Sequence, residues 1–290
     1  MRHLASQVSF GSTRPALGAP AIEWVRVQRA LADDAVVCLY DRAGLGWSDP
    51  APWPRTASRM ADELHELLLA ADVRPPYVLV GHSMGGYVAR LFAARQPDSL
   101  AGMVLVDSSH EDQFQRLAPF EQRTLGADRS KLRALQRQLR PLGIVRASVD
   151  LGINTEPHRD ALRECPADLV DVGVALALTS SHRRAVVQEL LGFEAGAAEV
   201  RAETRHLDTL PLTVVTGGST GREQFGDGWN VAWQGLQNEL TRLSERGTQL
   251  VADHTGHHVQ HDDPALVAGT IRELVEHVRR RSSQARAPHS

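Results

Sequence analysis

Short apolar segments alternate with longer segments of helical periodicity along most of the chain. The apolar segments are 35–40, 77–80, 102–106, 212–216 and 248–252. The helical patterns between and around them cover 21–32, 57–71, 84–95, about 229–245 and 264–280. Such alternation is typical of parallel strands whose sheet is covered by helices. We therefore predict an α/β fold with a mostly parallel central sheet flanked by helices.

The stretch from 111 to 205 breaks this rhythm. It is rich in Arg, Leu, Ala and Glu, has helical periodicity and contains no convincing strand, although strands are expected on both sides of it. An inserted helical cap above the sheet explains the interruption. The predicted core then comprises 1–110 and 206–280, the cap comprises 111–205, and 281–290 forms a flexible, solvated tail.

Composition excludes several classes of protein. The net charge of −3 argues against a nucleic-acid partner, which requires a concentrated basic surface. Lys131 is the only lysine, so Schiff-base or Walker-type chemistry has little support. The two cysteines provide neither a disulfide framework nor a zinc pattern. The N-terminus lacks the apolar core of a signal peptide and no segment reaches a membrane-spanning length, so we expect a cytoplasmic protein.

The clearest chemical signal is the segment "YVLVGHSMGGYVARLFA" at 77–93. A β-rich run ends in Gly-His-Ser-Met-Gly and passes directly into a helical pattern. This context predicts a nucleophile elbow, the sharp strand-to-helix turn that exposes a serine hydroxyl. The turn strains the backbone and leaves no room for side chains beside the serine, which explains the glycines. Ser83 is therefore the predicted nucleophile.

Three segments together resemble the α/β-hydrolase superfamily. They are "DRAGLGWSDP" at 41–50, "GHSMGG" at 81–86 and "DHTGHHVQHDDPALV" at 253–267. The resemblance covers most of the chain and implies a triad in the order serine, acid, histidine, with the cap at 111–205. It identifies His257 as the catalytic base, while His258 points elsewhere and His254 and His261 lie at a polar surface. Asp41 and Arg42 are expected to form a structural ion pair.

The acid has two candidates. In the family it commonly follows the strand predicted at 212–216, but the first aspartate after that strand is Asp227, eleven residues beyond Thr216. An alternative family arrangement places the acid at the end of the preceding strand, where this chain has Asp107. Groups at the carboxyl ends of neighbouring parallel strands gather near each other. We favour Asp107 and keep Asp227 as the alternative.

An acyl-transfer site also needs donors for the oxyanion. The resemblance implies the backbone N–H groups of Met84 and Leu17, with Ala16 in place of the family's usual glycine. Upstream of Leu17 the sequence "MRHLASQVSFGSTRP" contains no clear β-rich strand. We therefore expect the family's N-terminal strands to be missing or divergent, as an altered start of the chain would cause.

The resulting prediction is a serine hydrolase that cleaves a small to medium carboxylic ester or related acyl compound, without cofactor or metal. A small-molecule acyl substrate is the expected partner. One alternative is a catalytically impaired binding protein with the same fold. Another is a metal-dependent hydrolase built on His257 and His261, whose spacing suits one helix face. Gly256 and Pro264 favour a loop there instead, and the zinc-protease motif requires Glu where this chain has His258.

Overall fold

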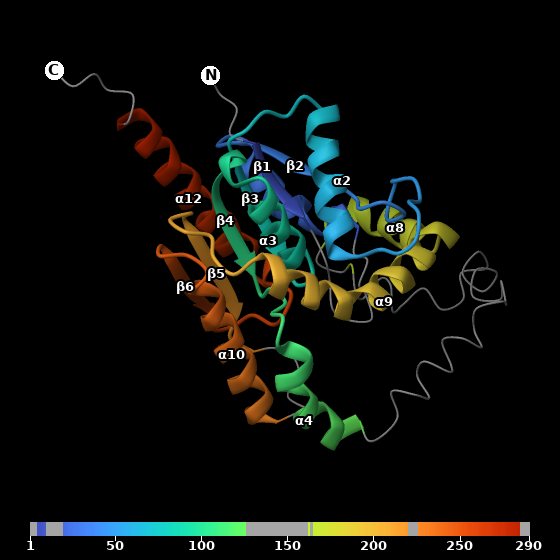
Figure 1. Ribbon diagram of the computed structural model, residues 1–290. Helices are drawn as coiled ribbons and strands as arrows, with labels where there is room; N and C mark the ends of the chain where they lie inside the picture. Colours follow the sequence, from blue (N-terminus) through green and yellow to red (C-terminus); the bar gives the residue numbers. More distant parts are fainter. Residues whose placement is uncertain (1–4, 10–19, 126–161, 163–164, 220–225, 285–290) are drawn as a thin grey trace.

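The computed structural model describes residues 5–9, 20–125, 162, 165–219 and 226–284 (Figure 1). The strands are β1 Ala5–Ser9, β2 Val36–Leu39, β3 Tyr77–His82, β4 Leu100–Val106, β5 Leu212–Gly217 and β6 Gly247–Ala252. The α-helices are α1 Val25–Leu31, α2 Ala57–Ala70, α3 Gly85–Arg95, α4 Gln113–Leu125, α8 Ala167–Ala177, α9 Ser180–Glu203, α10 Asp227–Thr241, α11 Val259–Asp262 and α12 Pro264–Gln284. The 3₁₀ helices are η1 Ala21–Trp24 and η2 Pro97–Ser99.

The six strands form one parallel sheet in the order β2-β1-β3-β4-β5-β6. Five of them coincide with the five predicted apolar segments, which confirms the predicted fold class. The sixth, β1, lies upstream of Leu17, where the N-terminal strands are expected to be missing or divergent. Strand β1 lies inside the sheet, with Ala5 paired to Val36 on one side and to Tyr77 on the other. Its sequence "ASQVS" lacks the apolar run of a buried strand, so pattern reading missed it.

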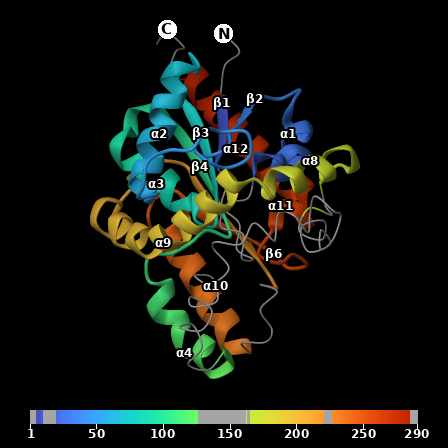
Figure 2. The ribbon, with the colours of Figure 1, turned by 90° about the vertical axis from the view of Figure 1, so that its right-hand side faces the viewer.

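Successive residues of the central strands pack into two separate cores. Leu79 of β3 and Met103 and Leu105 of β4 belong to one core, while Val80 and Val104 belong to the other. Strand side chains alternate between faces, so a strand covered on both faces is apolar throughout. Helices α2 and α3 cover the first face, and α1 and α12 cover the second (Figure 2).

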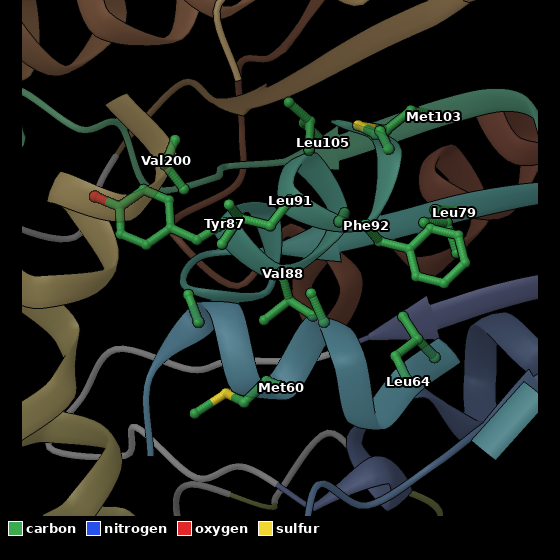
Figure 3. Close-up of a cluster of buried hydrophobic side chains, with 14 of the residues drawn as sticks. Met60, Leu64, Leu79, Tyr87, Val88, Leu91, Phe92, Met103, Leu105 and Val200 are labelled. Atoms are coloured by element: carbon green, nitrogen blue, oxygen red, sulfur yellow. The ribbon is translucent and has the colours of Figure 1, made fainter. Parts of the chain in front are cut away.

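The first core is centred on α3, the helix that follows the predicted nucleophile (Figure 3). Val88, Leu91 and Phe92 of α3 are at most 1% exposed. They pack with Met60 and Leu64 of α2 on one side and with the strands on the other. Because α3 is buried on several sides, the turn at its N-terminus is held in a fixed position relative to the sheet.

The predicted cap region contributes α4, α8 and α9 to the described residues. Helix α9 runs across the ends of α2 and α3, and the space for a side chain at Gly192 is occupied by the backbone of Arg55. Helix α4 packs on α10 through Leu117 and Trp229.

The C-terminal helix is longer than predicted. Helix α12 continues to Gln284, so residues 281–284 of the predicted tail are helical, while 285–290 lie outside the described residues. Among the helices that the structure describes, none is both long enough and apolar enough to cross a membrane.

A buried ion pair joins α9 to the segment that follows β2. Arg42 Nε and Nη2 donate to the two carboxylate oxygens of Glu189 in α9 at 2.7 and 2.8 Å, and both side chains are at most 2% exposed. Burial opposes the charge of Arg42, but Glu189 outweighs it and raises the pKa of the guanidinium. The predicted Asp41–Arg42 pair is thus replaced: the Asp41 carboxylate accepts from the backbone N–H groups of Ala21 and Trp47.

We predict that Arg42→Met lowers the free energy of unfolding by about 3 kcal/mol, because it leaves the Glu189 carboxylate buried without its partner. The double variant Arg42→Met/Glu189→Leu should recover part of this loss, since both charges are removed. Urea denaturation measures both changes. Arg74→Gln, which breaks an exposed pair with Asp72, is the control and should leave the unfolding midpoint unchanged. A double variant that is no more stable than Arg42→Met would contradict the prediction.

Candidate active site

Ser83 lies in the turn between β3 and α3 with φ at +51°, in the left-handed region that side chains disfavour. Two close approaches hold this turn. A Cβ on Gly81 would lie 2.7 Å from the Gly85 carbonyl oxygen, and a Cβ on Gly86 would lie 2.4 Å from Ser108 Oγ. The Ser83 hydroxyl is buried and makes no hydrogen bond to any of the described residues. The local geometry is that of the predicted elbow.

Asp107 directly follows β4 and is fully buried. Its Oδ1 accepts from the backbone N–H of Gly217, at the end of β5, at 3.1 Å and from Trp233 Nε1, in α10, at 2.9 Å. Its Oδ2 lies 2.5 Å from His257 Nδ1. A buried carboxylate is costly unless it is hydrogen-bonded, and here three different elements provide partners.

His257 lies in the segment between β6 and α11 and is 8% exposed. The preceding residue packs closely on the sheet: a Cβ on Gly217 would lie 2.2 Å from the Gly256 carbonyl oxygen. His82, at the end of β3, donates from Nε2 to the His257 carbonyl at 2.8 Å. Burial and the adjacent His257 lower the pKa of His82 well below its ordinary value, which leaves a neutral ring as the donor. The segment is thus held from two sides.

Ser83 lies close to both Asp107 and His257. Its N–H donates to the carbonyl of Val106 at 3.3 Å, and its carbonyl accepts from Ser109 N–H at 2.9 Å. The backbone of Ser83 is thus hydrogen-bonded to residues on either side of Asp107 in the sequence. The ring of His82, the residue before Ser83, lies 4.7 Å from that of His257, centroid to centroid. The structure therefore brings Ser83, Asp107 and His257 together at the carboxyl end of the sheet.

The alternative acid lies elsewhere. Asp227 is the first residue of α10 and is exposed, where its charge suits the N-terminus of the helix.

Of the two predicted oxyanion donors, Met84 is the N-cap of α3, where helix N–H groups have no intrahelical acceptor. Leu17 lies outside the described residues.

The other histidines of "DHTGHHVQHDD" only partly follow the sequence prediction. His254 is exposed, as expected, and Asp263 Oδ1 caps α12 by accepting from Leu266 N–H at 2.8 Å. The prediction of a surface position for His261 is wrong. It is 7% exposed, its Nε2 lies 3.3 Å from Glu23 Oε2, and its ring stacks on that of His258. It is buried because η1 packs over α11, a contact between distant parts of the chain.

Comparison with known proteins identifies the family to which this fold belongs. A profile of the alpha/beta hydrolase fold matches residues 15–141. A protein of Gibberella zeae described as an AB hydrolase superfamily protein is 31% identical, over 88% of this chain and 83% of its own length. The chain belongs to the α/β-hydrolase superfamily. A Bacillus subtilis protein, YqjL, is 26% identical over 86% of this chain and 77% of its own length.

Solved structures share the α/β-hydrolase fold with this chain. A thermophilic esterase from Thermogutta terrifontis superimposes with a TM-score of 0.65 at 20% identity, covering 96% of this chain and 91% of the esterase. The epoxide hydrolase CorEH superimposes with a TM-score of 0.63 at 17% identity, covering 95% and 92%. Since different hydrolases have this fold, the chemistry has to be argued from the site.

Two site residues escaped the sequence analysis. Trp233 contacts Asp107 across 126 positions, and Gln237, one turn further along α10, donates to the Ser108 carbonyl at 2.6 Å. Both side chains lie on the buried face of α10. The periodicity of the sequence there predicts that this face packs on the core, but not which residues it contacts. Nothing in the spacing of α10 points to the end of β4, so only the packing of α10 against the sheet reveals their partners.

Proposed function

We propose that this α/β hydrolase is a serine hydrolase that cleaves a small to medium carboxylic ester, or a related acyl compound, through an acyl-enzyme. The nucleophile is Ser83, the base His257 and the acid Asp107. The observation that carries the proposal is the buried 2.5 Å contact between His257 Nδ1 and Asp107 Oδ2 beside the strained Ser83 turn. A serine hydroxyl needs such a base, and the base needs a carboxylate that fixes its tautomer.

In the first half of the reaction, His257 Nε2 takes the proton of Ser83 as Oγ attacks the acyl carbonyl carbon. The tetrahedral intermediate then expels the alcohol, which receives the proton from His257. In the second half, His257 takes a proton from water, the hydroxide attacks the acyl-enzyme, and Ser83 leaves with the proton returned. Asp107 stays ionised and stabilises the imidazolium in both halves.

Negative charge on the carbonyl oxygen needs donors that are already in place. The backbone N–H of Met84 serves here, supported by the N-terminal dipole of α3, which is buried and points at the reacting group. Leu17 N–H is proposed as the second donor on the family resemblance alone. The serine at the elbow favours acyl transfer over epoxide opening, because the family's epoxide hydrolases have an aspartate there.

Ser83 provides the first of three predictions about the reaction. A fluorophosphonate probe should label the wild-type protein and fail to label Ser83→Ala, because the probe reacts with an activated serine hydroxyl. Labelling is measured by fluorescence in a denaturing gel and by intact mass, with heat-denatured protein as control. If the folded wild type is not labelled, the serine-hydrolase proposal falls and a binding protein of the same fold takes its place.

The second prediction separates the two acids. Asp107→Asn should lower kcat for p-nitrophenyl butyrate by roughly 10³- to 10⁴-fold, because an amide no longer holds the correct tautomer of His257. Asp227→Asn is the matched control, the same change at an exposed helix start, and should alter kcat less than about twofold. The opposite ranking of the two variants would transfer the role of the acid to Asp227.

The third prediction concerns Trp233 as a positioning residue for Asp107. Trp233→Phe keeps an aromatic ring and removes the indole donor, a loss of about 1 kcal/mol, so kcat should fall about fivefold to tenfold with KM unchanged. Trp229→Phe makes the same change one turn earlier in α10, where the ring stacks on Trp233, and should leave kcat within about twofold. Equal losses of kcat in both variants would show that packing, not the hydrogen bond, is responsible.

A further inference from the structure

A second polar cluster lies beside the segment that holds His257. Glu23 comes from η1, His261 from α11, and His258 is the residue directly before α11. Glu23 and His261 are each 7% exposed, and His258 is half-buried. The proposed hydrolysis uses none of the three. Buried carboxylates and imidazoles in this arrangement need a physical reason, because desolvation of such groups is unfavourable.

The distances within the cluster suit one metal ion. One ligand atom from each residue lies within 4.8 Å of the other two. Zinc bonds of about 2.0–2.1 Å place two ligand atoms of a tetrahedron roughly 3.4 Å apart. The separation of Glu23 Oε2 from His261 Nε2 is 3.3 Å, which already meets this requirement. The ring of His258 stacks on that of His261 with centroids 5.3 Å apart, and its ligand atom lies within 4.8 Å of the other two.

The chemistry of the donors is also suitable. His258 Nδ1 is buried and makes no hydrogen bond to any of the described residues. Two imidazoles and one carboxylate are a ligand set that zinc accepts, with water as the fourth ligand.

Another group of possible ligands, formed by His110, Asp112 and Glu239, is less suitable for a metal ion. Arg201 Nη2 lies 2.5 Å from Asp112 Oδ1, and Arg116 Nη1 lies 2.7 Å from Glu239 Oε1. Both carboxylates therefore already have a cationic partner. A metal ion would have to displace two arginines there.

We propose that Glu23, His258 and His261 bind one zinc ion that fastens the segment carrying His257 to η1. The site is distinct from the proposed triad: its ligands exclude His257, whose Nδ1 faces Asp107. The ion would join residue 23 to residues 258–261 and stabilise a junction between distant parts of the chain. Zinc binding requires neither Ser83 nor hydrolysis.

The test uses the full, untagged chain after treatment with a chelator and desalting. Titration with zinc chloride against a chromophoric chelator should show one tightly bound zinc per chain, and elemental analysis after desalting should give the same ratio. Glu23→Gln, which keeps the size of the side chain, should weaken zinc binding by more than about 100-fold, as should His261→Ala. Cobalt should give the visible absorption of a four-coordinate site in the wild type and not in Glu23→Gln.

Two controls make the result specific. His254→Ala removes an exposed histidine of the same segment and should bind zinc like the wild type, as should Ser83→Ala. Circular dichroism checks that each variant is folded, and His258→Asn, at the half-buried position, replaces any variant that is not. The proposal is overturned if the folded wild type retains no equimolar zinc, or if folded Glu23→Gln or His258→Asn binds zinc as tightly as the wild type.

Discussion

The burial of the Asp107 carboxylate is the constraint on which the candidate site depends. A carboxylate with no exposed surface requires donors around it, and these come from the end of β5, from α10 and from the segment after β6. Each donor fixes the position of its element relative to β4. His257 is one of these donors. Its contact with Asp107 therefore both stabilises the buried carboxylate and orients the proposed base.

The strain at Ser83 depends on close packing of a different kind. The turn between β3 and α3 is compressed against the segment after β4, where Ser108 Oγ donates to the Gly81 carbonyl at 2.7 Å. A left-handed conformation persists only where its surroundings enforce it. Helix α3, buried between α2, α9 and the sheet, provides that enforcement (Figure 3). The conformation of the Ser83 turn therefore depends on the packing of the core around α3.

Two buried polar contacts also join segments that are far apart in the sequence. Arg42 and Glu189 connect the segment after β2 with α9, and Glu23 and His261 connect η1 with α11. In both cases an acid and a base far apart in sequence are buried together. Removing one partner of such a pair would leave the other buried without its contact, so each pair links two distant segments.

The α/β class, five of the six strands in the described residues and the elbow sequence around Ser83 could all be predicted from the sequence, because burial on two faces and a strand-to-helix turn leave strong local patterns. The sequence also narrowed the acid to Asp107 or Asp227. The folded structure was needed to show that Asp107 contacts His257, that the polar segment 5–9 is a strand inside the sheet, and that His261 is buried. The physical reason is that these outcomes depend on contacts across many residues, such as Trp233 with Asp107, which no local periodicity records.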